Sequence, residues 1–207
     1  MNTKDLAAVI DTIAALMAEN RDYLVALDQQ NGDGDLGISM SDGYRASAEY
    51  LKTFDGTDLG VALNKAANVF NEAAPSSLGT ITAFIFKGMA KYLKGKESAS
   101  CEEMAKAILA GLDNVSSKAG SKRGEKTILD SLYPGAEALL ANADDDIAVA
   151  AEKAFAAAEE GSEATRNMKA VWGRAAYYGE KSIGVLDGGS VVGKLVFRGI
   201  ADWAMKA

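Results

Sequence analysis

Apolar residues recur in steps of three and four positions along most of this chain, which is the period of an amphipathic α-helix. The first apolar face runs from Leu6 to Leu24, and Thr3 or Asp5 is expected to cap it. The same period predicts further helices over residues 40–51, 59–72, 81–93, 100–116, 128–141, 145–160, 164–171 and 190–206. No segment alternates as a half-buried strand does, so the pattern predicts one all-α domain over residues 1–207.

Composition and charge exclude several classes of function, although they add little about the fold. The chain has 22 Lys and Arg residues against 29 Asp and Glu, a formal net charge of −7. It lacks the basic excess that displaces counterions from nucleic acid, so no nucleic-acid partner is expected. It has no His, which excludes Ser-His-Asp and Cys-His catalytic sites and any His-liganded metal. The single Cys101 excludes a disulfide framework.

Neither a membrane span nor an export signal is evident in the sequence. The longest stretch without a charged residue, residues 73–86, is too short to cross a bilayer and contains Pro75 and Gly79. The first residues lead directly into the first predicted helix, with Asp5 inside it and no apolar export segment. We therefore expect a cytoplasmic protein with no membrane partner.

A glycine-rich loop between the first two predicted helices holds three carboxylates, Asp28, Asp33 and Asp35. Gly32 and Gly34 let the backbone fold tightly, so the carboxylates can converge. Converging carboxylates repel one another, and a bound cation relieves that repulsion. Hard oxygen ligands select Mg²⁺ or Ca²⁺. The alternative is a solvated acidic turn, in which Asp and Gly serve turn geometry alone.

Three other loops between predicted helices offer hydroxyl, glycine and basic groups. Residues 74–80 carry Ser and Thr at a helix start, residues 120–127 are basic, and residues 173–190 form a long glycine-rich connection that contains Arg174. Taken singly, each has an ordinary explanation as a helix cap or a solvated loop. Loops at one end of a bundle can converge, however. An acidic loop beside hydroxyl and basic loops is typical of a magnesium–nucleotide site.

In this order the motifs resemble the nucleotide-binding L subunit of the dihydroxyacetone kinases. The sequence reads Leu-Asp-x-x-x-Gly-Asp-x-Asp-x-Gly from Leu27, Ser-Ser-Leu-Gly-Thr from Ser76 and Gly-x-Lys-Thr from Gly124. It then reads Gly-Arg-Ala-x-Tyr-x-Gly-Glu-x-Ser-Ile-Gly from Gly173 and Asp-x-Gly from Asp187. The resemblance covers nearly the whole chain. It implies an eight-helix antiparallel barrel with the nucleotide site in loops at one end.

The resemblance also implies roles for individual residues. Asp28, Asp33 and Asp35 would hold two Mg²⁺ ions against the phosphates of ADP or ATP, and Arg174 would add positive charge in the transition state. No other catalytic residue is implied. The nucleotide-contacting positions carried over from the family are Leu36, Gly37, Ser39, Ser76, Ser77, Gly79, Thr80, Gly120, Thr127, Ile128, Arg174, Asp187, Gly188 and Gly189. The sequence departs from the family at Leu36, where His is frequent, and at Gly188, where Pro is usual.

The family resemblance implies partners as well. There the keto-sugar is held on a K subunit, covalently through a His. Because this chain has no His, we expect it to need such a partner to phosphorylate dihydroxyacetone or a related triose or tetrulose. In phosphotransferase-coupled members an M-type subunit rephosphorylates bound ADP, whereas in ATP-dependent members ATP exchanges. The donor stays open at this point, as does a homodimer.

Two other functions of the same residues remain open. One is a nucleotide-binding regulatory subunit without transfer activity of its own. The other is a domain of the fatty-acid-kinase type, in which the nucleotide domain is fused to further domains, whereas this sequence ends with its last predicted helix. A purely structural bundle is disfavoured because all three Asp positions of the acidic loop are intact.

Overall fold

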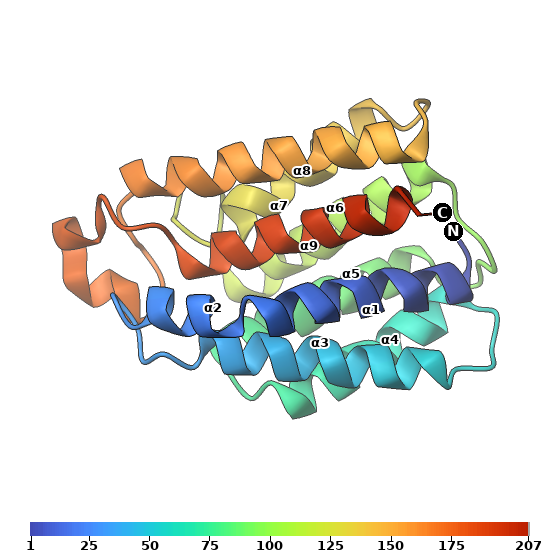
Figure 1. Cartoon of the computed structure of the whole chain (residues 1–207), viewed down its shortest axis with the longest axis horizontal. Helices are drawn as coiled ribbons and strands as arrows, with labels where there is room; N and C mark the ends of the chain where they lie inside the picture. The colour runs from blue at the N-terminus through green and yellow to red at the C-terminus, as the bar shows by residue number, and fades with distance from the viewer. Residues whose placement is uncertain (207) are drawn as a thin grey trace.

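The computed structural model describes residues 1–206, which form α-helices and the loops that join them (Figure 1). The α-helices are α1 (Thr3–Glu19), α2 (Arg21–Asp28), α3 (Leu36–Lys52), α4 (Leu59–Ala73), α5 (Ser77–Tyr92), α6 (Cys101–Ala119), α7 (Leu129–Ala141), α8 (Ile147–Ala164) and α9 (Gly188–Ala204). Two 3-10 segments, Thr165–Asn167 and Arg174–Ser182, lie between α8 and α9. Within residues 1–206 the only β pairing is an isolated bridge, which confirms the all-α prediction. None of these helices combines the length and the apolar character needed to cross a bilayer.

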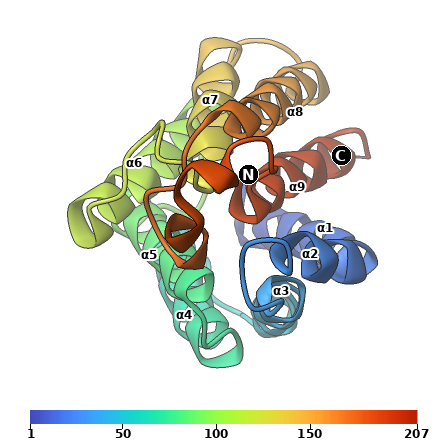
Figure 2. The ribbon, with the colours of Figure 1, turned by 90° about the vertical axis from the view of Figure 1, so that its left-hand side faces the viewer.

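Viewed along their common axis, the helices stand in a ring (Figure 2). Each helix packs against the next in chain order, and α9 closes the ring against α1. Because only Asn20 separates α1 from α2, these two helices share one position, so nine α-helices fill eight positions. An even number of positions lets neighbouring helices alternate in direction all the way round. This is the eight-helix antiparallel barrel that the family resemblance implied.

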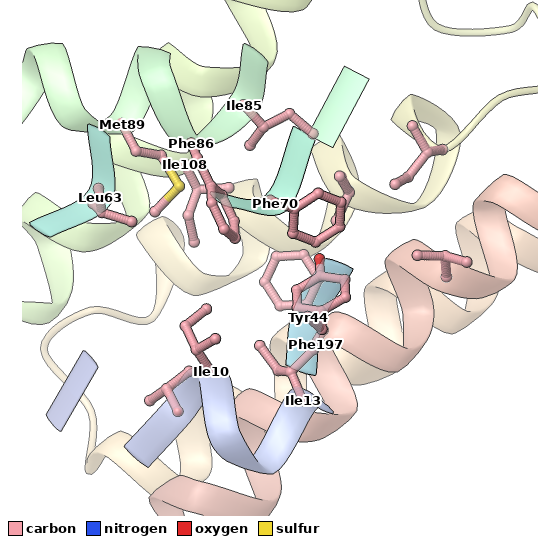
Figure 3. Close-up of a cluster of buried hydrophobic side chains, with 14 of the residues drawn as sticks. Ile10, Ile13, Tyr44, Leu63, Phe70, Ile85, Phe86, Met89, Ile108 and Phe197 are labelled. Atoms are coloured by element: carbon pink, nitrogen blue, oxygen red, sulfur yellow. The ribbon is translucent and has the colours of Figure 1, made fainter. Parts of the chain in front are cut away.

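Aromatic side chains from neighbouring helices fill the middle of the ring (Figure 3). Tyr44 of α3 meets Phe70 of α4 edge-on with ring centroids 5.0 Å apart, and Phe70 meets Phe86 of α5 at 5.8 Å. Ile13 of α1 and Phe197 of α9 belong to the same buried cluster. Edge-to-face pairs add to the stabilisation from burial. Packing among helix side chains thus stabilises the ring, and the loops contribute little to this buried cluster.

A cavity of about 340 Å³ remains inside the ring beside this cluster. Its lining includes Ile10, Leu63, Met89, Met104 and Trp203, and apolar atoms predominate throughout. Within the described residues no carboxylate or basic side chain faces it. Besides the Trp203 indole, the polar side chains of its lining are those of Tyr44, Thr82, Ser100 and Cys101.

Two of the predicted helices differ from the structure in more than their bounds, whereas α3 and α5 are present but begin four residues earlier than predicted. The first apolar face is broken at Asn20, whose side-chain Nδ2 donates to the carbonyl oxygen of Leu16 at 2.8 Å and so competes with the helical ladder. The helix predicted over residues 164–171 is wrong. There α8 ends at Ala164, a single 3-10 turn follows, and the backbone is extended at Met168. The apolar residues of that stretch do not share a face, because Ala170 is buried and its neighbour is exposed.

Neither residue expected to cap the first helix, Thr3 or Asp5, is its N-cap. Asn2 caps α1, since its side chain accepts hydrogen bonds from the backbone N–H groups of Lys4 and Asp5. The Asp5 carboxylate reaches back to the Asn2 backbone N–H and completes a capping box. Asp5 therefore contributes to the cap as its reciprocal partner, while Thr3 is already inside the helix.

Candidate functional site

Four interhelix loops meet at the end of the ring that faces the viewer in Figure 2. Since neighbouring helices alternate in direction, the α2–α3, α4–α5, α6–α7 and α8–α9 connections all fall at this end. They surround a cleft of about 910 Å³, which we call the cleft from here on. The predicted site residues that line it are Asp28, Asp33, Asp35, Leu36, Ser76, Ser77, Thr80, Thr127, Ile128, Arg174, Asp187, Gly188 and Gly189.

The three carboxylates of the α2–α3 loop converge at the cleft. One oxygen from each of Asp28, Asp33 and Asp35 lies within 4.8 Å of the others, and we call these residues the acidic cluster. The loop turns tightly because Gly32 has no side chain, since a β-carbon there would lie 2.2 Å from Asp28 Oδ1. Gly34 has a φ of +79° and donates its backbone N–H to Asp28 Oδ2 at 2.8 Å. Two glycines thus shape the loop around its carboxylates.

The charges of the acidic cluster are only partly balanced by protein groups. Partial burial raises the pKa of Asp35, and the neighbouring carboxylates of Asp33 and Asp28 raise it further. Arg174, from the α8–α9 connection, lowers it and places its guanidinium 2.6 Å from Asp33. Three carboxylate oxygens at this spacing match the hard donor set of Mg²⁺, and a cation would relieve the repulsion. The residues therefore fit a divalent cation.

The start of α5 forms the next wall of the cleft. Ser76 caps this helix, its Oγ accepting a hydrogen bond from the backbone N–H of Gly79 at 3.0 Å. Ser39 of α3 supports it from behind with an Oγ–Oγ hydrogen bond of 2.5 Å. Ser77 and Thr80 line the cleft at the first turn. Free N–H groups and the helix dipole make such a terminus favourable for phosphate oxygens.

Four of the predicted positions shape the walls without lining the cleft. Ser39 and Gly79 act through Ser76, as above. Gly37 lets α3 approach α2, because a β-carbon there would lie 2.1 Å from the carbonyl oxygen of Arg21. Gly120 ends α6 in the left-handed conformation, with a φ of +78°. These four residues determine the shape of the backbone around the cleft. Their positions do not indicate a direct contact with a nucleotide.

The wall beside α9 is built on Asp187. This residue caps α9 by accepting the Ser190 backbone N–H at 2.7 Å. Burial raises the pKa of Asp187 to about 7, against the lowering effect of the Ser190 N–H and the Lys126 ammonium. Next to it, a β-carbon at Gly188 would lie 2.5 Å from Leu36 Cδ2. Leu36 and Gly188, at both of which the sequence departs from the family pattern, therefore lie next to each other in the cleft.

Three cleft residues with polar side-chain atoms were not among the predicted site residues. Lys126 is 3% exposed and has a φ of +62°. Ser121 Oγ is buried and has no hydrogen-bond partner within the described chain. Trp172 lines the cleft and donates its Nε1–H to Glu125 Oε2 at 2.5 Å. Only Lys126 had a signal in the sequence, the Gly-x-Lys-Thr motif. The roles of the other two depend on backbone turns that no local pattern reveals.

Comparisons with known proteins agree on one group of relatives. The sequence pattern of a family described as DAK2 domain matches residues 30–202. The chain is 32% identical over 182 residues to "PEP-dependent dihydroxyacetone kinase 1, ADP-binding subunit DhaL" of Listeria innocua, covering 87% of this chain and 86% of the relative. It is 27% identical over 201 residues to "L-erythrulose 1-kinase" of Mycolicibacterium smegmatis, covering 96% of this chain but 35% of the relative.

The fold is similar to a solved structure as well. It matches the crystal structure of the dihydroxyacetone kinase from C. freundii in complex with AMP-PNP and Mg²⁺, with a TM-score of 0.75 and 23% identity. The match covers 95% of this chain and 33% of that one. This chain therefore spans about a third of the erythrulose and C. freundii kinases, but most of the Listeria subunit.

Proposed function

Because this chain belongs to the DAK2 domain family, we propose that it is the Mg²⁺- and nucleotide-binding subunit of a dihydroxyacetone-type kinase. It would transfer a phosphoryl group to a small ketose held on a partner K subunit. The observation that carries this proposal is the acidic cluster, whose oxygens lie within 4.8 Å of one another. The cluster faces the N-terminus of α5 across a cleft of about 910 Å³.

The arrangement of charges supports a metal and a nucleotide bound together. Bare phosphates would be repelled by Asp28, Asp33 and Asp35, so an anion enters this part of the cleft only with a cation. Two relatives point the same way by name, one as an ADP-binding subunit and the other as a kinase solved with AMP-PNP and Mg²⁺. We propose two Mg²⁺ ions on the acidic cluster and ADP or ATP in the cleft.

In the proposed mechanism this chain positions the donor and neutralises its charge. When bound, Mg²⁺ supplies positive charge to the phosphate oxygens as a Lewis acid. Ser76 and Ser77 present the start of α5 to the phosphates, and Thr127 and Ile128 line the proposed adenine site. Arg174 adds a guanidinium as charge develops in the transition state.

The acceptor and its base would come from the partner. Transfer breaks the bond between the γ-phosphorus and the β–γ bridging oxygen and forms a bond to the ketose hydroxyl oxygen, whose proton passes to a base on the K subunit. This chain has no His with which to hold a ketose covalently. Likeness to an L-erythrulose 1-kinase keeps a tetrulose beside dihydroxyacetone as the proposed acceptor.

The phosphoryl donor and the assembly belong to the same proposal. The name of the Listeria relative, a PEP-dependent enzyme, favours rephosphorylation of bound ADP by an M-type subunit over exchange of ATP. A homodimer is the alternative assembly. Sedimentation of the chain alone and with K-type and M-type subunits separates these arrangements, and steady-state assays with ATP or with the complete phosphotransfer chain identify the donor.

The first test is calorimetric titration with ADP and ATP, with and without Mg²⁺, on the parent protein and on Asp33→Asn. We expect binding that requires Mg²⁺ and is lost in the variant. The matched control is Asp42→Asn, which removes an exposed carboxylate of α3 that pairs with Arg45 away from the cleft. Binding that ignores both Mg²⁺ and Asp33→Asn, or no binding in any protein, would overturn the proposed function.

A further inference from the structure

The connection between α8 and α9 reaches out of the ring and returns to it, and it carries Trp172 and Arg174 of the cleft lining. It spans residues 165–187, which we call the α8–α9 segment, and it is visible as the orange to red excursion at the left of Figure 1. Trp172 and Arg174 of this segment line the cleft, and Arg174 pairs with Asp33. Their positions therefore depend on how the two ends of the segment are held.

A single ammonium group joins the two ends. Lys126 Nζ donates one hydrogen bond to the carbonyl oxygen of Thr165 and another to that of Val185, both at 2.6 Å. Two further hydrogen bonds lie alongside, from the Gly184 N–H to the Arg166 carbonyl oxygen at 2.7 Å and from the Asp187 N–H to the Thr165 side-chain Oγ1 at 3.1 Å. The two ends of the segment lie side by side here, and we call this place its neck. Lys126 closes the neck through two hydrogen bonds from its charged ammonium group.

The backbone at Lys126 is adapted to this contact. Lys126 is the one non-glycine residue with a positive φ in the part of the chain that the structure describes. A left-handed conformation is unfavourable for a residue with a β-carbon and persists where the surroundings enforce it. A buried ammonium is also unfavourable unless its donors are satisfied. Lys126 thus combines a left-handed backbone with a buried ammonium group, and its hydrogen bonds across the neck offset these two unfavourable features.

The residue before Lys126 holds the middle of the same segment. Glu125 accepts the Trp172 Nε1–H on its side chain, and its backbone carbonyl accepts the Val171 N–H at 3.3 Å. Two adjacent residues of the α6–α7 loop thus contact the segment at two places, Lys126 at its neck and Glu125 at Trp172. These contacts join the loop and the segment beside the cleft.

We propose that Lys126 is a positioning residue, which closes the neck of the α8–α9 segment and so keeps Trp172 and Arg174 at the cleft. It contacts the backbone of the segment, and it acts on a bound nucleotide through those two side chains. The affinity part of this inference rests on the proposed function, whereas the structural part does not.

The test follows Trp172 directly. The chain has two Trp residues, so Trp203→Phe leaves Trp172 as the only indole reporter. In that background we compare Lys126→Met with Lys153→Met, a matched control because Lys153 Nζ also makes two hydrogen bonds, on the outer surface of α8. Lys126→Gly removes the ammonium and also relieves the left-handed strain, so it carries the test if Lys126→Met does not fold.

We expect both Lys126 variants to shift Trp172 emission to longer wavelength and to increase its quenching by acrylamide, with no ligand present. If release of the neck leaves about a tenth of the molecules with the segment in place, the apparent Kd for Mg–ADP rises about tenfold. Lys153→Met changes neither. Unchanged Trp172 emission and quenching in a folded Lys126 variant would overturn the inference. A Trp172 response without nucleotide binding in any protein would uphold it and reject the proposed function.

Discussion

The two ends of the helical ring differ in how their helices are capped and in which charges and polar groups are left unbalanced. At the end away from the cleft, α1 and α6 begin with complete capping boxes, in which Asn2 pairs with Asp5 and Ser100 with Glu103. Asp58 caps α4 there and also accepts the Gly95 backbone N–H at 3.0 Å. Local partners three residues apart satisfy these helix starts, so this end stabilises the fold.

The cleft end departs from the same local rules. The acidic cluster concentrates like charges, Lys126 holds a left-handed backbone, and Ser121 Oγ has no partner in the described chain. Natural sequences are locally consistent with their folds, and departures gather where function requires them. The comparison indicates that the far end stabilises the fold, whereas the cleft end keeps charges and a buried hydroxyl that a ligand would balance. Each prediction below separates these two requirements.

The largest expected effect comes from neutralising Asp35. Without metal, Asp35→Asn should raise the free energy of unfolding, because repulsion from Asp33 and Asp28 is removed. Mg²⁺ at about 100 times its Kd should add about 2.7 kcal/mol to the parent and little to the variant. Urea unfolding with and without Mg²⁺ measures both. Asp58→Asn at the far end should leave the Mg²⁺ effect intact, and full Mg²⁺ stabilisation of Asp35→Asn would contradict the prediction.

The pH dependence of stability gives the next effect, through Asp187. Its pKa of about 7 in the folded chain exceeds the ordinary value of 3.8, so between these values the folded state keeps a proton that the unfolded state has lost. The free energy of unfolding should therefore fall as pH rises from about 4 to 7 and level off above. Asp187→Asn should flatten the profile, while Asp58→Asn should not. Urea midpoints across this range decide it.

The sequence predicts the helices well wherever the apolar period and the loops agree. It correctly predicts the all-α class, because the helical period is a local property. The meeting of the loops at one end was implied by the family resemblance and not by local spacing. The sequence pattern fails over residues 164–171, where apolar residues occur without sharing a face. It also misses the break at Asn20, since the competing hydrogen bond to Leu16 is made by one side chain. The apolar period of a sequence indicates which face of a helix is buried. It does not reveal a hydrogen bond made by a single side chain.

The candidate site also contains a part that the sequence predicts and a part that it does not. Asp28, Asp33 and Asp35 are close in sequence, so their convergence follows from one glycine-rich loop. The contacts of Lys126 join it to Thr165 and Val185, 39 and 59 positions away, and no local pattern contains them. Long-range closure of the α8–α9 segment was therefore beyond the sequence.

A smaller effect should separate two equivalent helix caps. Ser76 and Ser100 each accept an N–H three residues on, at the cleft end and at the far end respectively. Ser76→Ala and Ser100→Ala should each lower the free energy of unfolding by about 1 kcal/mol. Only Ser76→Ala should also weaken Mg–ADP binding, because α5 begins at the cleft whereas α6 begins at the far end. Thermal unfolding and calorimetry on both variants test this, and equal affinities would remove the distinction between the two ends.

The smallest expected effect on stability, and the most selective, concerns Ser121. Its buried hydroxyl has no partner in the described residues, so Ser121→Ala removes a desolvated group without breaking a hydrogen bond. Ser131 is the matched control, because its buried Oγ donates to the Ile128 carbonyl oxygen at 3.0 Å, and Ser131→Ala should cost about 1 kcal/mol. Ser121→Ala should leave unfolding unchanged or slightly harder while weakening nucleotide binding, since the hydroxyl is expected to find its partner only in the filled cleft. If Ser121→Ala instead destabilises the free protein as much as Ser131→Ala does, the hydroxyl is already satisfied without a ligand, and the cleft end is less dependent on its ligand than the structure indicates.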